Sequence, residues 1–173
     1  MHDQFADLLT PAGEIAWRTA RAQAAMAAQG LDALFIVQNA DLYYFAGAVQ
    51  EGLLAILAAG EPLFLVRRVL DRAREESPLQ RIVPVGSPRE YPAGLAAHGI
   101  GPLRRVGLEL DVLPAAQYLR QGRAFPGVES WTPRRWSGPS ARSSDPGRWS
   151  RCGGPPASRI GWCVASAKWR GPA

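Results

Sequence analysis

LDALFIVQNADLYYFAG, residues 31–47, is the stretch of sequence that decides the fold. Gly30 stands before it as a helix stop, and five consecutive apolar residues then lead to the polar pair Gln38-Asn39. A short apolar run bounded by turn residues is typical of a strand that is buried on both faces. We therefore expect a core strand over residues 33–37.

The second half of this stretch is aromatic. Tyr43, Tyr44 and Phe45 come just before Gly47. Glycine permits a sharp backbone reversal, and aromatic rings bury a large apolar area. This half therefore predicts a tight turn or a short helix that caps the edge of the sheet.

The alanine-rich segment before Gly30 is expected to be a helix that begins at Thr10-Pro11. The Thr10 hydroxyl would cap it, the proline ring presets the backbone, and an acid at position 14 suits the positive end of the helix dipole. The helical spacing turns Ile15, Ala22 and Met26 toward a core and leaves Arg18 and Arg21 facing water.

The rest of the first 130 residues alternates between strand and helix. Residues 52–57 and 62–66 are apolar runs around a turn, which predicts an antiparallel hairpin. Alternating strands and helices indicate an α/β domain, and the hairpin makes its sheet mixed. Further helices are expected over residues 70–77, 88–98 and 113–121, and further strands over residues 81–85 and 106–110 and beyond residue 128.

This order of segments resembles the N-terminal domain of the creatinase/prolidase/aminopeptidase P family, the pita-bread metallopeptidases. The family's turn after the first strand reads N-x-x-Y-L-T-G. Here Tyr44 and Gly47 match it, Asp41 stands where Asn is common, and Ala46 replaces Thr. The likeness continues through GEPLFLVRR (60–68), RAREES (72–77) and VGLELDVLPAAQYLRQ (106–121), and it ends near Val128.

The resemblance implies a three-layer α/β/α domain of ribonuclease H-like type. In the family this domain helps to form dimers, and its loops edge the substrate cleft of the partner subunit. The catalytic site, two divalent ions such as Mn or Co held by two Asp, one His and two Glu, lies in the C-terminal domain. We therefore expect no catalytic residue, metal ligand or cofactor in this chain, and a peptide substrate only for the parent enzyme.

Four residues are candidates for the cleft edge or the subunit interface, because loops leave the strands at their positions: Tyr44, Gln50, Arg67 and Arg68. An arginine there can pair with a peptide carboxylate through two parallel hydrogen bonds. The competing interpretation is that both arginines are ordinary surface residues.

Other reactive side chains are sparse. Glu109 and Asp111 alternate at the end of an expected strand, where they would either chelate a cation or, as we expect, face solvent. The two histidines, His2 and His98, lie on a terminus and a helix end without carboxylates at ligand spacing. As a polypeptide on its own, the chain shows no catalytic constellation.

The chain consists of two differently composed parts. Residues 1–129 carry 12 arginines, no lysine and 14 acidic residues, a formal charge of −2, whereas residues 130–173 carry 7 arginines, one lysine and one acid, giving +7. The second part holds five of the six tryptophans and both cysteines but no Leu, Phe, Tyr, Met, Asn, Gln or His. We expect a domain over residues 1–129 and an unstructured tail over residues 130–173.

Two interpretations of the tail compete. A basic arm rich in tryptophan would bind nucleic acid by neutralising phosphates and stacking on bases. Alternatively, the tail is GC-rich coding DNA translated in the wrong frame, so that the chain is a truncated metallopeptidase. A stand-alone interaction domain descended from the same family is a third possibility, favoured if the tail is in frame.

The genetic code favours the change of frame. In the frame that joins the last base of each codon to the next two bases, Trp131-Thr132 forces Asp, and Pro146-Gly147 permits Trp fifteen positions later. The family commonly runs GVELVDASPLIRxLRxxKSPWEVE here, with the same spacing from Asp to Trp. Gly127-Val128 leads into that motif in the printed frame.

Targeting signals and membrane spans are not expected. The first residues, MHDQFADLL, include acids and no basic segment, and no apolar run is long enough for a membrane helix. The two cysteines form neither a disulfide framework nor a zinc site. The sequence therefore predicts a cytoplasmic domain that forms homo-oligomers, with no membrane partner and no nucleic acid partner.

The change of frame is tested by the coding DNA from codon 120 onward. We expect another frame to continue through V-D-A-S and P-W-E-V-E into the Asp, Asp, His, Glu and Glu ligands of a metallopeptidase. If no frame does so, the tail belongs to the protein, and the basic-arm interpretation is then favoured over the change of frame.

Overall fold

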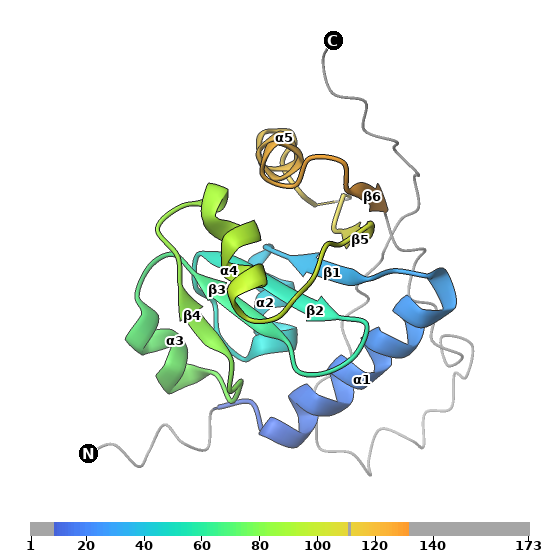
Figure 1. Cartoon of the computed structure of the whole chain (residues 1–173). Helices are drawn as coiled ribbons and strands as arrows, with labels where there is room; N and C mark the ends of the chain where they lie inside the picture. Colours follow the sequence, from blue (N-terminus) through green and yellow to red (C-terminus); the bar gives the residue numbers. More distant parts are fainter. Residues whose placement is uncertain (1–8, 111, 132–173) are drawn as a thin grey trace.

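A computed structural model of the chain describes residues 9–110 and 112–131 (Figure 1). Its centre is a six-stranded sheet with the strand order β4-β3-β2-β1-β5-β6. The strands are β1 (Ala33–Ile36), β2 (Gly52–Leu57), β3 (Leu63–Val66), β4 (Ile82–Pro84), β5 (Arg105–Leu108) and β6 (Glu129–Trp131). The helices are α1 (Ala12–Gln29), α2 (Asn39–Ala46), α3 (Leu70–Glu76), η2 (Pro88–Glu90), α4 (Tyr91–Ala97) and α5 (Ala115–Ala124).

Strand β1 lies in the middle of the sheet and joins its two halves. It pairs antiparallel with β2, where Ala33 lies opposite Leu57, and parallel with β5, where Ala33 lies opposite Val106. All four residues of β1 are buried. The expected core strand is therefore confirmed, as is the expected antiparallel hairpin of β2 and β3. The parallel pairs β3–β4 and β5–β6 complete the mixed sheet.

Helices cover both faces of the sheet, which confirms the predicted three-layer α/β/α architecture (Figure 1). One face packs side chains of α1, α2 and α3 against alternate residues of the strands, such as Leu34 and Ile36. The other face packs α4 and α5 against the intervening residues, such as Phe35, whose ring lies 5.0 Å from that of Phe125. Successive side chains of β1 point to opposite faces of the sheet, so the strand contributes to two separate apolar cores.

Helix α1 differs from the sequence prediction in two ways: its N-terminal cap and the environment of Arg18. Pro11 is the N-cap and no side chain caps the helix, so the expected Thr10 hydroxyl cap is wrong. Gly30 ends the helix in the left-handed conformation, as predicted. Arg18 does not face water freely, because its Nη1 donates to the Tyr44 carbonyl oxygen at 2.8 Å. Ile15, Ala22 and Met26 are buried, as expected.

Strand β6 includes the first two residues of the expected tail. Ser130 and Trp131 pair with β5 as part of β6. The Trp131 indole lies 4.7 Å from the Arg105 guanidinium, and its Nε1 donates to Gln29 Oε1 at 3.3 Å. The remainder of the predicted unstructured tail, residues 132–173, lies outside the described residues.

Candidate functional site at the ends of β2 and β3

Two of the predicted residues, Arg67 and Arg68, meet the same carboxylate at the end of β3. Antiparallel pairing brings Glu51, just before β2, beside them, and the Arg67 amide donates to the Glu51 carbonyl at 2.7 Å. Arg67 Nη1 donates to Glu51 Oε1, while Arg68 Nε lies 3.4 Å from Oε2. The side chain of Arg68 is 75% exposed and that of Arg67 only 23%. Arg68 is therefore the arginine that faces solvent.

Gln50 lies beneath the surface rather than on a rim. It is buried, and its Nε2 donates to Glu76 Oε2 on α3 at 3.4 Å. The other oxygen of Glu76, Oε1, accepts from Arg72 Nε at 2.5 Å. Gln50 thus ties the loop before β2 to helix α3, and the structure brings it close to the charged pair on that helix.

Tyr44 lies apart from the other three predicted residues. Its ring contacts Phe45 edge-on, with the centroids 4.8 Å apart, and the Arg18 guanidinium lies 4.2 Å from its centroid. A cation above an aromatic face is attracted by the ring quadrupole. Tyr44 therefore joins α1 to α2, and the structure does not bring it to the ends of β2 and β3.

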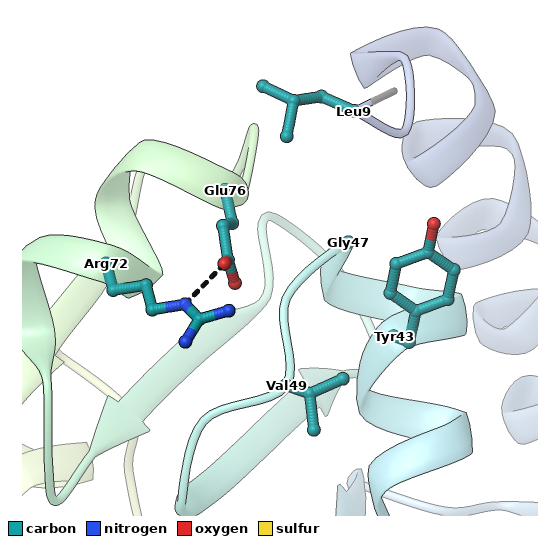
Figure 2. A pocket seen from close by; sticks show the side chains of 6 residues that line it. All are labelled: Leu9, Tyr43, Gly47, Val49, Arg72 and Glu76. Atoms are coloured by element: carbon teal, nitrogen blue, oxygen red, sulfur yellow. Dashed lines mark hydrogen bonds and ion pairs between the residues drawn. The ribbon is translucent and has the colours of Figure 1, made fainter. Parts of the chain in front are cut away.

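A cavity of about 280 Å³ opens between α2, α3 and the loop that follows α2. Figure 2 shows Arg72 and Glu76 on one wall and Tyr43 and Val49 on the facing side, with Leu9 above. Gly47, the left-handed residue that ends α2, lies between the walls. The cavity therefore combines one ion pair with an otherwise apolar lining.

Sequence reasoning missed every lining residue of this cavity. The spacing of four residues between Arg72 and Glu76 on a predicted helix is a readable signal for an ion pair. Nothing in the sequence shows that α3 packs beside the loop after α2, which is what places this pair opposite Val49. The cavity arises from tertiary packing.

A second cluster of reactive groups lies at the carboxyl ends of β1 and β5, on the same edge of the sheet as the start of β2. Glu109 is only 1% exposed, and its Oε2 accepts from the backbone amides of Val37 at 2.8 Å and Gln38 at 3.2 Å. The expectation that Glu109 faces solvent is therefore wrong. Its alternation with Asp111 does not expose it, because the end of β1 covers it. Asp111 itself lies outside the described residues.

The other Glu109 oxygen, Oε1, is buried and has no hydrogen-bond donor among the described residues. The buried carboxyl group of Asp41 lies beside the carboxyl group of Glu109. Two carboxylates bond to each other only through a proton, since both are otherwise acceptors. Burial and then the bond to Asp41 raise the pKa of Glu109 to about 9, although the Val37 amide opposes the shift. Glu109 is therefore protonated at neutral pH.

The buried carboxyl group of Glu109 also supports the fold around it. Gln38 caps α2 by accepting from the amides of Ala40 and Asp41, so the turn held by Glu109 also starts that helix.

Within residues 9–110 and 112–131, no group of three or more His, Cys, Asp or Glu is arranged to hold a metal ion. His98 bonds the Gly94 carbonyl through Nδ1 at the end of α4. No helix in the described part of the chain is both long and apolar enough to cross a bilayer.

Comparisons with known proteins agree with this fold. Residues 18–133 match the family model of the creatinase/prolidase N-terminal domain. The search of curated protein sequences gave no match. Among solved structures, an Xaa-Pro dipeptidase from Bacillus anthracis is similar with a TM-score of 0.57 and 18% identity, over 66% of this chain and 32% of that chain.

Two shorter solved chains are similar over most of their length. An aminopeptidase P from Streptococcus thermophilus has a TM-score of 0.56 and 20% identity, over 67% of this chain and 89% of that one. The N-terminal domain of the cytoplasmic peptidase PepQ from Mycobacterium tuberculosis has a TM-score of 0.54 and 20% identity, over 65% and 88%. The chain thus spans about a third of the Bacillus anthracis enzyme and nearly all of these two chains.

Replacing Glu109 with Gln tests the protonated pair. Between the ordinary pKa of 4.5 in the unfolded chain and about 9 in the fold, unfolding releases a proton. The stabilisation is therefore complete below pH 4.5 and is lost as the pH rises through 9, by at most about 1.4 kcal/mol per pH unit. Glu109→Gln keeps the same shape, accepts from both amides and donates to Asp41, but it does not titrate.

Urea unfolding of both proteins between pH 5 and pH 9 measures this difference. We expect the free energy of unfolding to fall less steeply with pH in Glu109→Gln than in the unmodified chain, because the glutamine does not titrate. Glu61→Gln, in the exposed turn between β2 and β3, is the matched control and should keep the slope of the unmodified chain. Equal slopes for all three proteins would show that Glu109 is not protonated in the fold.

Proposed function

Because this chain belongs to the creatinase/prolidase N-terminal domain family, we propose that it is the non-catalytic N-terminal domain of an Xaa-Pro aminopeptidase or prolidase-like metallopeptidase. The observation that carries the proposal is the match over residues 18–133, which ends two residues after β6. The similar solved structures named as Xaa-Pro dipeptidase and aminopeptidase P support the choice of parent enzyme.

Two acids of the sheet support a structural role for this domain. Glu109 is buried and accepts from the amides of Val37 and Gln38, and the Asp32 carboxylate accepts from the amides of Arg104 and Arg105. Both acids thus hold the ends of β1 and β5 together. In our proposal the two metal ions, Mn or Co, and the peptide substrate belong to the catalytic domain of the parent enzyme.

The second part of the proposal is that this domain mediates a homodimer and edges the partner's substrate cleft. Among the four candidates, Arg68 is the residue suited to reach a neighbouring subunit, because its guanidinium is mostly exposed and only weakly held by Glu51. Arg67 stabilises this edge by pairing with Glu51, and Gln50 does so by bonding Glu76 on α3. Tyr44 contacts Arg18 and so packs α2 against α1. We place the parent enzyme in the cytoplasm, in line with the relative named as a cytoplasmic peptidase.

The proposal is tested by assaying the purified 173-residue chain with Xaa-Pro dipeptides and longer Xaa-Pro peptides in the presence of Mn²⁺, Co²⁺ or Zn²⁺. We expect no cleavage above that of the metal ion alone, because the ligands for the ions are not supplied by this domain. Light scattering on the same sample should give twice the monomer mass of 18.7 kDa.

The two readouts separate the two parts of the proposal. Metal-dependent cleavage that follows the protein through purification would overturn the non-catalytic role. A uniform monomer would overturn the homodimer and leave the family membership untouched.

A further inference from the structure

We propose that the cavity between α2, α3 and the loop after α2 binds the carboxy-terminal residue of a peptide, with its carboxylate on Arg72 and its apolar side chain against Leu9, Tyr43 and Val49. The inference goes beyond the proposed function, and it rests on the contacts within this chain alone. It also moves the expected carboxylate contact from Arg67 and Arg68 to a residue on α3.

The charged wall of the cavity presents a guanidinium whose outer edge is open. Arg72 meets Glu76 through Nε, and neither of its Nη nitrogens is hydrogen-bonded to any residue in the described ranges. The two Nη groups can therefore offer parallel donors to a carboxylate, the geometry in which arginine binds that group most strongly. The Glu76 pair holds the guanidinium in place before a ligand arrives, which lowers the cost of ordering it.

Arg72, rather than Glu76, is the charge that the site presents to a ligand. Glu76 Oε1 is taken by Arg72 and its Oε2 by Gln50 Nε2, so both oxygens already have a donor. A ligand carboxylate meets the Nη donors of Arg72, which make no hydrogen bond among the described residues. The side chain of Glu76 is 28% exposed and that of Arg72 is 66% exposed, so the cationic group is the more accessible of the two.

The opposite wall gives the site its preference for an apolar side chain. Leu9, Tyr43 and Val49 are 41%, 50% and 41% exposed, unusually high for large apolar residues, and all three line this one cavity (Figure 2). Exposed apolar surface that gathers at one hollow is typical of a binding site. Gly47 lies between the walls in the left-handed conformation, where a Cβ would lie 3.3 Å from Pro78 and 3.4 Å from Thr10.

The volume limits the ligand to about one residue. At about 280 Å³ the cavity lies just below the range of roughly 300–1,000 Å³ that holds cofactors and drug-sized molecules. It has room for a leucine or phenylalanine residue with its terminal carboxylate. The preceding residues of a peptide would then lie outside, on the exposed side of the loop.

Binding is measured by NMR on the full chain with labelled methyl groups, using the tripeptide Ala-Ala-Leu and its carboxy-terminal amide as probes. We expect saturable shifts of the Leu9 and Val49 methyl signals with the free acid and at least about tenfold weaker binding of the amide, the loss of a charge-assisted pair. The methyl signals report on the cavity itself, so that attraction of the acid to basic residues elsewhere is not mistaken for the site.

Arg72→Gln is the test variant and Arg74→Gln, an exposed arginine on the same helix, is its matched control. Arg72→Gln should weaken binding of the acid about tenfold and remove the preference over the amide, whereas Arg74→Gln should bind within about twofold of the unmodified chain. The comparison of acid with amide on the unmodified chain stands even if a variant fails to fold.

Three results would overturn the proposal. The first is the absence of saturable shifts at Leu9 and Val49 with the free acid. The second is equal binding of acid and amide by the unmodified chain. The third is a shift of these methyl signals on dilution of the chain without peptide, which would show that a second copy of the chain fills the cavity.

Discussion

Two buried or partly buried carboxylates lock the parallel pair β1–β5, and the rest of the domain depends on that pair. Asp32, just before β1, accepts through Oδ2 from the amides of Arg104 and Arg105 at 2.7 and 2.8 Å. Glu109, just after β5, accepts from Val37 and Gln38 at the other end of β1. Each strand thus carries an acid that satisfies the backbone donors of its neighbour, across more than 70 residues of intervening chain.

The pKa values of the two acids are shifted in opposite directions. Backbone amides of Arg105 and Arg104 lower the pKa of Asp32, which stays charged at the edge of the sheet. Glu109 is enclosed, and its pKa rises because burial and the neighbouring Asp41 disfavour the charged form. Glu109 also holds the Gln38 amide, and the Gln38 side chain caps α2, so the acid helps to fix the start of that helix. Helix α2 in turn forms one side of the cavity.

The sequence was sufficient for the architecture but not for the site. Apolar runs and Gly30 predicted the central strand, the hairpin and the end of α1, because those patterns report burial and local backbone freedom directly. Alternation predicted a solvent-facing Glu109, which failed because the end of β1, far away in sequence, covers it. The change of composition after residue 129 concealed that Ser130 and Trp131 complete β6. Composition reports no hydrogen bonds, and only the pairing with β5 shows that these two residues belong to the sheet.

The most direct test of this account is amide hydrogen exchange of the native chain, read by NMR at Val37, Gln38, Arg104 and Arg105. These amides lie at strand ends, where exchange is ordinarily fast, but each donates to a carboxylate that locks β1 to β5. We predict that all four exchange only with an opening free energy close to that of global unfolding. Exchange at the rate of exposed loop amides, while Phe35 and Leu108 stay protected, would show that the two carboxylates do not hold the sheet together.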